Sequence, residues 1–301
     1  MIELIIDTDI GNDSDDAGAL AIAHQLENLG ECKILAITSS TSRLDGALCI
    51  DAINQYYHKS HIPVGMSTKS SFLDETTGYG QYSRAIVNQY KTTLTHVPTS
   101  TNILRQALAK TCNKVVFVTL GPLNNIKDLL MSPPDQYSPM NGHDLVQTKV
   151  EKFVVMGGDF SKEDVIFMLD NQKMIAEWNI LQDVDSAQYV IHQLDTPILF
   201  VPYAVGLIKT GHRLFSEPNY ESPIKLAYKV HNNGPRQSWD PIAVYVAVRG
   251  TKSLFHVSEQ GKVIVHNDGR TLFTPNQGNH QYLINHIDES KTIQCLDEYI
   301  L

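Results

Sequence analysis

The chain has 301 residues, of which 42% are hydrophobic, and its formal net charge is −9. This size allows a large buried core, whereas the acidic balance and the lack of a basic run argue against a nucleic-acid partner. No apolar run reaches the roughly 18 residues of a membrane span, the N-terminus lacks the regions of a signal peptide, and the four cysteines are scattered, so we expect a cytoplasmic protein with reduced thiols.

The first predicted elements are a strand, a tight loop and a helix. Apolar residues dominate positions 2–6, which favours a buried strand. Gly11 and the Asn, Asp and Ser residues beside it are typical of a loop. Residues 17–26 are predicted to be helical, with Asp13 or Ser14 available as the N-cap.

Strands and helices then alternate along the chain, as judged from short apolar runs and from apolar residues at helical spacing. Further strands are predicted over residues 33–38, 62–65, 114–119, 150–156 and 197–201. Further helices are predicted over residues 44–57, 81–90, 101–110, 123–131, 183–194, 224–231, 241–248 and 290–299. Residues 67–80 and 132–142 are predicted to be loops, and residues 262–284 antiparallel strands with a turn at 267–269.

This alternation predicts an α/β fold. Apolar strands that alternate with helices form a mostly parallel central sheet flanked by helices, in a Rossmann-like arrangement. No repeat, low-complexity segment or linker divides the sequence. We therefore expect residues 1–301 to form one domain.

Five aspartates follow the first predicted strand within ten residues. They are Asp7, Asp9, Asp13, Asp15 and Asp16. Open α/β sheets bind ligands at the carboxyl ends of their strands, and carboxylates this close repel one another unless a cation neutralises them. A hard cation such as calcium or magnesium suits carboxylate oxygens. An N-cap followed by a polar turn would explain one or two of the aspartates, but not five.

The segment Asp7-Thr-Asp9-Ile-Gly11, closed by Asp15-Asp16-Ala, resembles the aspartate signature of the inosine–uridine-preferring nucleoside hydrolase family. Two more residues separate Asp9 from the Asp pair than in the shortest family form. The resemblance implies hydrolysis of the N-glycosidic bond of ribonucleosides with a bound Ca²⁺. It implies that Asp9 is the general base and that Asp9 and Asp16 are calcium ligands.

Two further calcium ligands are implied by the same resemblance. The strand predicted over residues 114–119 is followed by Leu120 and then by Gly121-Pro122, and a strand that breaks at Gly-Pro leaves a carbonyl able to face a ligand. The family places a carbonyl ligand at the position of Leu120 and a distal carboxylate ligand at that of Asp240. Taken alone, Gly-Pro is also an ordinary turn.

A second motif combines Met156-Gly-Gly-Asp with Asn171, Glu177 and Asn179. Amide and carboxylate side chains can satisfy the hydroxyl groups of a desolvated ribose. The resemblance implies that Asn171 and Glu177 contact the 5′ side of the sugar and that Asn179 and Asp15 hold its 2′ and 3′ hydroxyls, with Met156 also at the substrate. The alternative is a polar loop that leads into the next helix.

A third motif is Trp239-Asp240-Pro241, in which Asp240 is expected to open a helix with Pro241 at its first position. Broadly specific family members carry a His before this Asp as the acid for the leaving group. Trp239 instead resembles the purine-specific members, in which a Trp stacks on the base, and such stacking contributes about 1–3 kcal/mol. Asp240 could also serve only as an N-cap, and Trp239 only as a core residue.

Four more residues are candidates for the rim of the site. Arg43 could pair with a carboxylate or meet a substrate phosphate. Tyr79 and Tyr82 in the glycine-rich loop and Tyr228 before the Trp239 helix are candidates for a lid over the base. Exposed loop tyrosines are common, so an ordinary surface role stays open for them.

The expected function is calcium-dependent hydrolysis of ribonucleosides, with purine nucleosides favoured. A non-catalytic or altered-substrate member that binds a ribosyl compound is the main alternative. A haloacid-dehalogenase-like phosphatase also begins with a strand and Asp-x-Asp, but it leaves Glu177 and Asn179 unexplained. The resemblance also implies a homo-oligomer, either a dimer or a tetramer, that takes a small-molecule nucleoside as its substrate.

Overall fold

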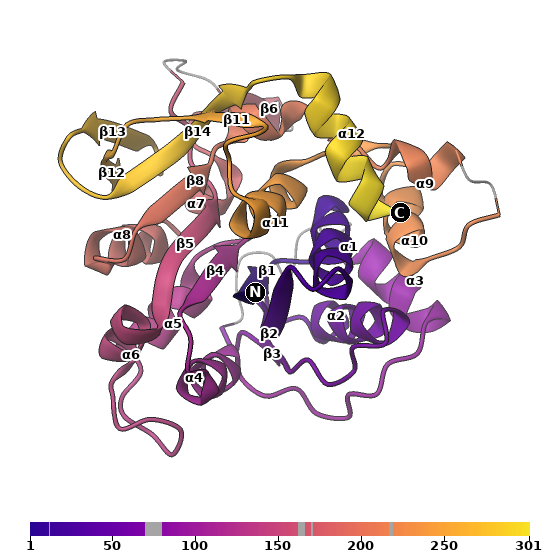
Figure 1. Cartoon of the computed structure of the whole chain (residues 1–301), viewed down its shortest axis with the longest axis horizontal. Coiled ribbons are helices and arrows are strands. Elements are labelled where there is room, and N and C mark those ends of the chain that lie inside the picture. The colour runs from indigo at the N-terminus through magenta and orange to yellow at the C-terminus, as the bar shows by residue number, and fades with distance from the viewer. Residues whose placement is uncertain (12, 70–79, 162–165, 170, 217–218) are drawn as a thin grey trace.

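A large sheet forms the centre of the computed structural model, which describes residues 1–301 except 12, 70–79, 162–165, 170 and 217–218 (Figure 1). Its strands are β1 Ile2–Thr8, β2 Cys32–Ser39, β3 Val64–Met66, β4 Val115–Thr119, β5 Val150–Met156, β8 Ile198–Val201, β11 Phe255–Val257, β12 Gly261–Val265, β13 Thr271–Pro275 and β14 His280–His286. Among the described residues, these ten strands run in the order β13-β12-β14-β8-β5-β4-β1-β2-β3, with β11 paired to β14.

Most of this sheet is parallel. The pairs from β3 through β2, β1, β4, β5 and β8 to β14 are all parallel. The pairs that involve β11, β12 and β13 are antiparallel. The predicted α/β fold with a mostly parallel central sheet and an antiparallel tail is therefore confirmed.

Helices cover both faces of the sheet, and each face has its own hydrophobic core (Figure 1). One core contains residues of α1 Asp15–Asn28, α2 Leu44–Tyr56, α3 Gln81–Gln89, α10 Pro223–His231, α11 Trp239–Arg249 and α12 Glu289–Ile300. The other contains residues of α4 Ser100–Lys110, α5 Asn124–Met131, α6 Gly142–Lys149 and α8 Val184–Gln193. Burial of apolar surface on both faces explains why the central strands are nearly continuous in apolar residues.

The strand order reverses at β1. The chain places β2 and β3 on one side of β1 and places β4, β5 and β8 on the other. The carboxyl ends of β1 and β4 therefore lie side by side at a topological switch point, where open α/β sheets bind their ligands. This is the place to which the sequence assigned the aspartate cluster and Leu120.

Several short elements were not predicted. They are the β6 Phe167–Leu169 and β7 Gln172–Met174 hairpin, α6, α7 Trp178–Gln182, the 3₁₀ helix η1 Tyr203–Leu207, α9 His212–Ser216, and the β9 Lys209–Thr210 and β10 Arg236–Gln237 pair. Each covers too few residues for a hydrophobic period to be visible in the sequence. Within the described ranges, none of the helices is both long and apolar enough to cross a membrane.

Two predicted helix starts differ from those observed by two residues. Helix α1 begins at Asp15 rather than Ala17, and Ser14 occupies its N-cap position without a side-chain capping bond. Helix α11 begins at Trp239, with Ser238 at the N-cap. The expectation that Asp240 opens this helix is therefore wrong, and its carboxylate lies in the first turn, where it is not needed as a cap.

Candidate functional site

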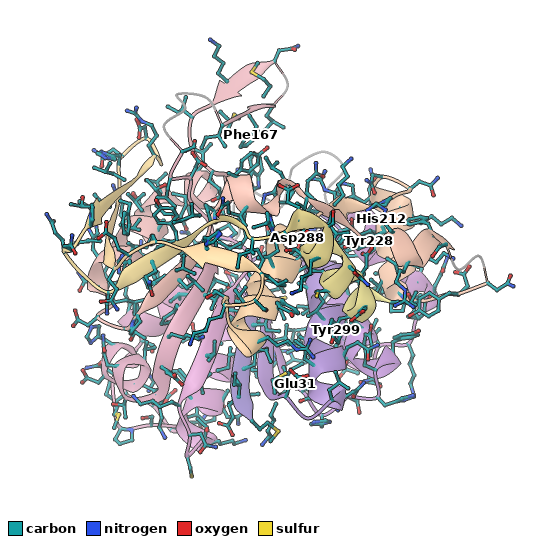
Figure 2. The ribbon with its side chains drawn as sticks, turned by 45° about the horizontal axis from the view of Figure 1, so that its top comes forward. Glu31, Phe167, His212, Tyr228, Asp288 and Tyr299 are labelled. Atoms are coloured by element: carbon teal, nitrogen blue, oxygen red, sulfur yellow. The ribbon has the colours of Figure 1, made fainter. Side chains whose placement is uncertain are left out.

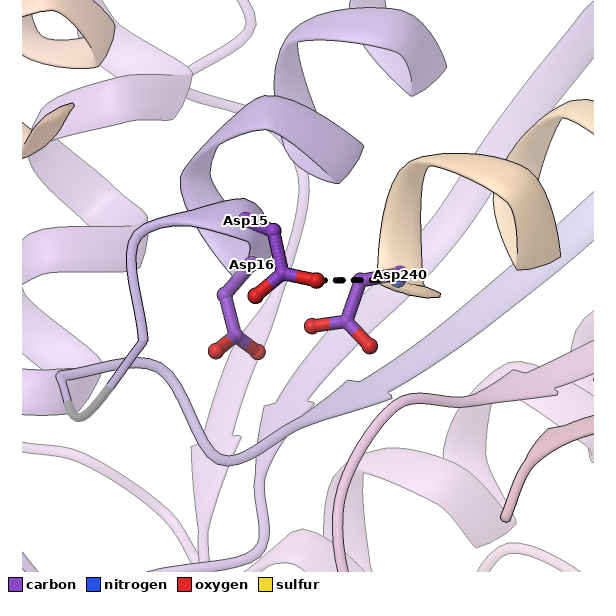
Figure 3. A group of neighbouring side chains, drawn as sticks. All are labelled: Asp15, Asp16 and Asp240. Carbon is purple, nitrogen blue, oxygen red and sulfur yellow. Dashed lines mark hydrogen bonds between the residues drawn. The ribbon is translucent and has the colours of Figure 1, made fainter. Parts of the chain in front are cut away.

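The site begins with three carboxylates at the starts of two helices. Asp15 and Asp16 lie in the first turn of α1, and Asp240 lies in the first turn of α11 (Figure 3). One oxygen from each carboxylate lies within 4.8 Å of the others, and all three side chains are buried. The backbone N–H of Asp240 donates to Asp15 Oδ2 at 3.2 Å. The positive ends of two helix dipoles therefore meet at one concentration of negative charge.

The concentration of buried negative charge at this site favours binding of a cation. Burial, and then the charges of neighbouring aspartates, raise the pKa of Asp16 and Asp240 well above the usual range, and burial likewise raises the pKa of Asp15. Among the described residues, no lysine or arginine forms an ion pair with these three carboxylates. Three buried carboxylate oxygens that no described lysine or arginine side chain pairs with directly fit a hard divalent ion.

Asp9 lies beside this group. It follows β1, it is 6% exposed, and burial raises its pKa to about 7, helped by the charges of Asp13 and Asp7. A side chain at Gly121 would put its Cβ only 2.7 Å from the Asp9 Cβ, so glycine is required where the chain leaves β4. The sequence analysis named Asp9, Asp16 and Asp240 as the carboxylate ligands of the metal. In the structure the three carboxylates that lie closest together are those of Asp15, Asp16 and Asp240.

The predicted sugar-binding residues Glu177 and Asn179 form a second buried network. Glu177 caps α7 and accepts from the backbone N–H groups of Asn179 at 2.9 Å, Ile180 at 3.2 Å and Gly158 at 3.1 Å. Burial raises the pKa of Glu177 to about 7. The Asn179 amide donates to the carbonyl of Leu120 at 2.7 Å and lies 3.0 Å from the sulfur of Met156. The structure therefore brings four predicted site residues together at the ends of β4 and β5.

Asn171 lies apart from this network. It is exposed at the turn between β6 and β7, with a φ of 64°. Asparagine tolerates this left-handed conformation better than most residues, so a turn explains its presence here. The structure does not bring Asn171 to the buried site that contains Glu177 and Asn179.

Trp239 connects the carboxylate group to an aromatic column. Its indole N–H donates to the carbonyl of Tyr203 at 2.8 Å, and its ring stacks on the Tyr203 ring at 5.5 Å between centroids. Tyr203 in turn stacks on Phe167 at 5.3 Å. Phe167 belongs to the β6–β7 hairpin, which stands out from the body of the molecule (Figure 2). The column thus runs from the start of α11 to the projecting hairpin.

Two tyrosines expected in a lid are structural. Tyr228 is fully buried in α10, and side chains at Gly18 or Gly211 would place Cβ 2.4–2.5 Å from its ring or hydroxyl. The expectation that Tyr228 belongs to a lid over the base is therefore wrong, because helix packing encloses its ring. Tyr82 is buried as well, and its hydroxyl accepts from Gly11 N at 2.6 Å and donates to the carbonyl of Asp13 at 2.8 Å.

The two remaining residues predicted at the rim of the site are Tyr79 and Arg43. Tyr79 lies outside the described residues. Arg43 precedes α2 and pairs with Asp45 at 3.0 Å, which is the first of the two roles considered for it. The pair is half-buried, at 17% and 19% side-chain exposure.

Sequence analysis missed three residues near the site, and two of them bind the loop between β1 and α1. Arg236 in β10 pairs with Asp13, with Nε 2.7 Å from Oδ1, although 223 positions separate them. His231 Nδ1 accepts from the backbone N–H of Ser14 at 3.0 Å. Tyr203 follows the end of β8, and strand ends were the available signal for it. No spacing in the sequence points to the Arg236 pair.

Comparisons with known proteins cover almost the whole chain. Residues 4–294 match the sequence model described as "Inosine-uridine preferring nucleoside hydrolase". The comparison with curated proteins gives no match.

Solved structures share the fold at low sequence identity. An inosine-uridine preferring nucleoside hydrolase from Bacillus anthracis superposes with a TM-score of 0.78 at 17% identity, covering 100% of this chain and 98% of that one. A purine-preferring ribonucleoside hydrolase from Gardnerella vaginalis gives 0.71 at 19%, covering 99% and 98%. The type III effector protein XopQ, complexed with adenosine diphosphate ribose, gives 0.76 at 14%, covering 99% and 93%.

Proposed function

This chain belongs to the inosine-uridine preferring nucleoside hydrolase family and is thus an N-ribosylhydrolase, and we propose that it uses Ca²⁺ to hydrolyse ribonucleosides, with purine nucleosides preferred. The observation that carries the proposal is the buried group of Asp15, Asp16 and Asp240 at the switch point of the sheet. Its donors are all carboxylate oxygens, which is the chemistry that calcium prefers.

The calcium ligands proposed are the carboxylates of Asp9, Asp16 and Asp240 and the carbonyl of Leu120, and Asp15 contributes an oxygen to the same group. When bound, Ca²⁺ would offset the negative charge of the buried carboxylates and polarise the water and sugar hydroxyls that reach it. Without a cation, ionising several of these carboxylates in a buried site would be costly. The donor set therefore fits the ion that the family implies.

The residues of the chain supply the proton transfer and the sugar contacts. Asp9, which is buried beside the carboxylate group, is proposed to accept the proton of the attacking water. Glu177 and Asn179 are proposed to hold the sugar hydroxyls, since their backbone contacts fix both side chains. Preorganised groups of this kind need no rearrangement as positive charge develops on the sugar ring.

The purine preference rests on the aromatic column. The indole of Trp239, which Tyr203 supports by stacking, offers a larger contact to a two-ring base than to a one-ring base. The purine-preferring relative from Gardnerella vaginalis is consistent with this choice. Self-association and a cytoplasmic location stay predictions from the sequence, as does the assignment of residues 1–301 to one domain.

The first test is release of reducing sugar from inosine, adenosine, guanosine, uridine and cytidine, with added calcium and with chelator. We expect chelator-sensitive release that is fastest for the purine nucleosides. Asp16→Asn should lower calcium affinity by more than the roughly 10- to 100-fold that loss of an outer-shell partner costs. Asp185→Asn, at an exposed carboxylate in α8, is the matched control and should retain activity.

One alternative has specific support. Because the structural relative XopQ was solved with adenosine diphosphate ribose, this chain could instead bind a larger ribosyl compound. Titration calorimetry with adenosine diphosphate ribose would detect such binding. Tight binding with no sugar released from any of the five nucleosides would overturn the hydrolase proposal in favour of this alternative.

A further inference from the structure

Arg236 is a cationic side chain held rigidly at the edge of the site. Its Nε lies 2.7 Å and 2.9 Å from the two carboxylate oxygens of Asp13, and its Nη2 also donates to Asp13. Its Nη1 donates to Gln237 Oε1 at 2.8 Å. A forked ion pair of this kind fixes the plane of the guanidinium as well as its position.

The guanidinium lies over the ring of Trp239, with Cζ 5.3 Å from the ring centroid. The next residue is Asp240, and Asp13 is two residues from Asp15, so both partners of the ion pair adjoin the carboxylate group. The side chain of Arg236 is 25% exposed. A base that approaches the indole of Trp239 therefore approaches the guanidinium as well.

The hydrogen-bond inventory of Arg236 leaves room for a ligand. A guanidinium carries five N–H donors. The contacts found in the described parts of the chain use the Nε donor, one on Nη1 and one on Nη2, which leaves one on each terminal nitrogen. Because Asp13 already balances its charge, the pair suits a neutral or weakly negative acceptor better than a phosphate.

We propose that Arg236, fixed by Asp13 and supported by Trp239, donates hydrogen bonds to the leaving base. The inference rests on the proposed function and identifies the group that takes the place of the missing histidine acid. In the reaction, the water oxygen bonds to C1′ and one water proton passes to Asp9. The bond from C1′ to the base nitrogen breaks, and its electron pair stays on the base.

Arg236 keeps its own protons, since a guanidinium is not deprotonated in proteins. It stabilises the negative charge that develops on the base, and solvent supplies the proton that the base finally takes up. Asp9 then returns its proton to solvent, so water and nucleoside become ribose and free base with no net gain or loss of protons. Purines offer nitrogen and oxygen acceptors around two rings, so two donors in one plane favour them.

Arg236 could instead act only by holding the loop between β1 and α1 in place. Tyr82 and His231 also bind this loop, through Gly11, Asp13 and Ser14. A residue that only holds the loop would affect the carboxylate group and hence every substrate alike. A residue that contacts the leaving group affects only substrates whose leaving group must be stabilised as it departs.

The experiment compares inosine with 4-nitrophenyl β-D-ribofuranoside, whose nitrophenolate leaves without activation. We expect Arg236→Gln to lower kcat for inosine by about 10²- to 10³-fold, the usual loss for one charge-stabilising donor, and to change kcat for the nitrophenyl riboside by less than about fivefold. Arg236→Lys, which keeps the charge, should recover part of the loss and keeps the test usable if the first variant folds poorly.

Arg249 provides a matched control. It lies at the opposite end of α11, pairs with Glu31 through two nitrogens, and contacts the rings of Tyr245 and Tyr299. Arg249→Gln should leave both substrates unaffected. Equal losses on both substrates for Arg236→Gln would overturn the proposal in favour of a role that only holds the loop. If the unmodified protein cleaved neither substrate, the proposed function itself would fail.

Discussion

The side-chain amide of Asn179 donates a 2.7 Å hydrogen bond to the backbone carbonyl of Leu120. This contact joins a predicted sugar-binding residue to a predicted metal ligand, and it spans 59 positions of the chain. The backbone N–H of Asn179 is bound in turn by Glu177. A substitution at any one of these residues should therefore change the positions of the others.

Asn179→Leu removes this donor while keeping a side chain of similar size. We expect kcat/KM to fall by about 10²-fold, because a small displacement of positioning groups has effects of that order. The fold should persist, since the backbone bond to Glu177 does not need the amide. Steady-state kinetics and the thermal midpoint measure the two effects. Asn279→Leu, which removes an amide that donates to the Asp195 carbonyl on the surface, is the control and should retain activity.

Gly121→Ala tests the close approach of β4 to Asp9. The new Cβ would lie 2.7 Å from the Asp9 Cβ and 2.8 Å from the Ser40 hydroxyl, so Asp9 must move. We expect a loss of activity of about 10²-fold or more, because the general base is displaced. Gly234→Ala, where no atom lies within 4 Å of the added Cβ, should have no such effect. Full activity of the Gly121 variant would show that Asp9 is not the base.

Tyr82→Phe removes the hydroxyl that bridges Gly11 and the Asp13 carbonyl. One buried and one partly buried backbone group lose a partner, which should reduce the free energy of unfolding by about 1–3 kcal/mol. Because the bridged loop precedes Asp15 and Asp16, calcium affinity should fall by roughly 10-fold or more. Urea denaturation and calcium titration by calorimetry measure these quantities. Tyr299→Phe, remote from the loop, should change stability but not calcium affinity.

His24 should make stability depend on pH. Burial against Tyr57 lowers its pKa from 6.5 to about 3, so the unfolded chain binds its proton more readily than the folded protein. Its contribution to stability is present above pH 6.5 and is lost as the pH falls toward 3. Between pH 7 and pH 5 this loss should be about 2 kcal/mol.

His24→Phe keeps an aromatic ring but removes the titratable group. Between pH 7 and pH 5 the free energy of unfolding of this variant should fall by about 2 kcal/mol less than that of the unmodified protein. Urea denaturation of both proteins at pH 7 and pH 5 gives the comparison. Equal pH dependence of the two proteins would mean that His24 is not the group responsible. His256→Phe, at an exposed histidine, is the matched control.

Much of the fold could be predicted because its signals are local. The apolar runs at residues 2–6 and 114–119 became β1 and β4, and the turn at 267–269 lies between two antiparallel strands. The β6–β7 hairpin could not be predicted in this way, since its strands have three residues each. Short elements depend on the contacts they make elsewhere, here the stacking of Phe167 on Tyr203.

The sequence by itself determined the order of strands and helices and the gathering of aspartates after β1, because hydrophobic spacing and chain-breaking residues act over a few positions. Only the tertiary structure decided that Asp240 joins Asp15 and Asp16, that Arg236 pairs with Asp13, that Asn171 is exposed at a turn, and that Tyr228 is buried in the core. These relationships join segments up to 225 positions apart. They follow from the packing of α11 and β10 against the start of α1, and no local pattern encodes that packing.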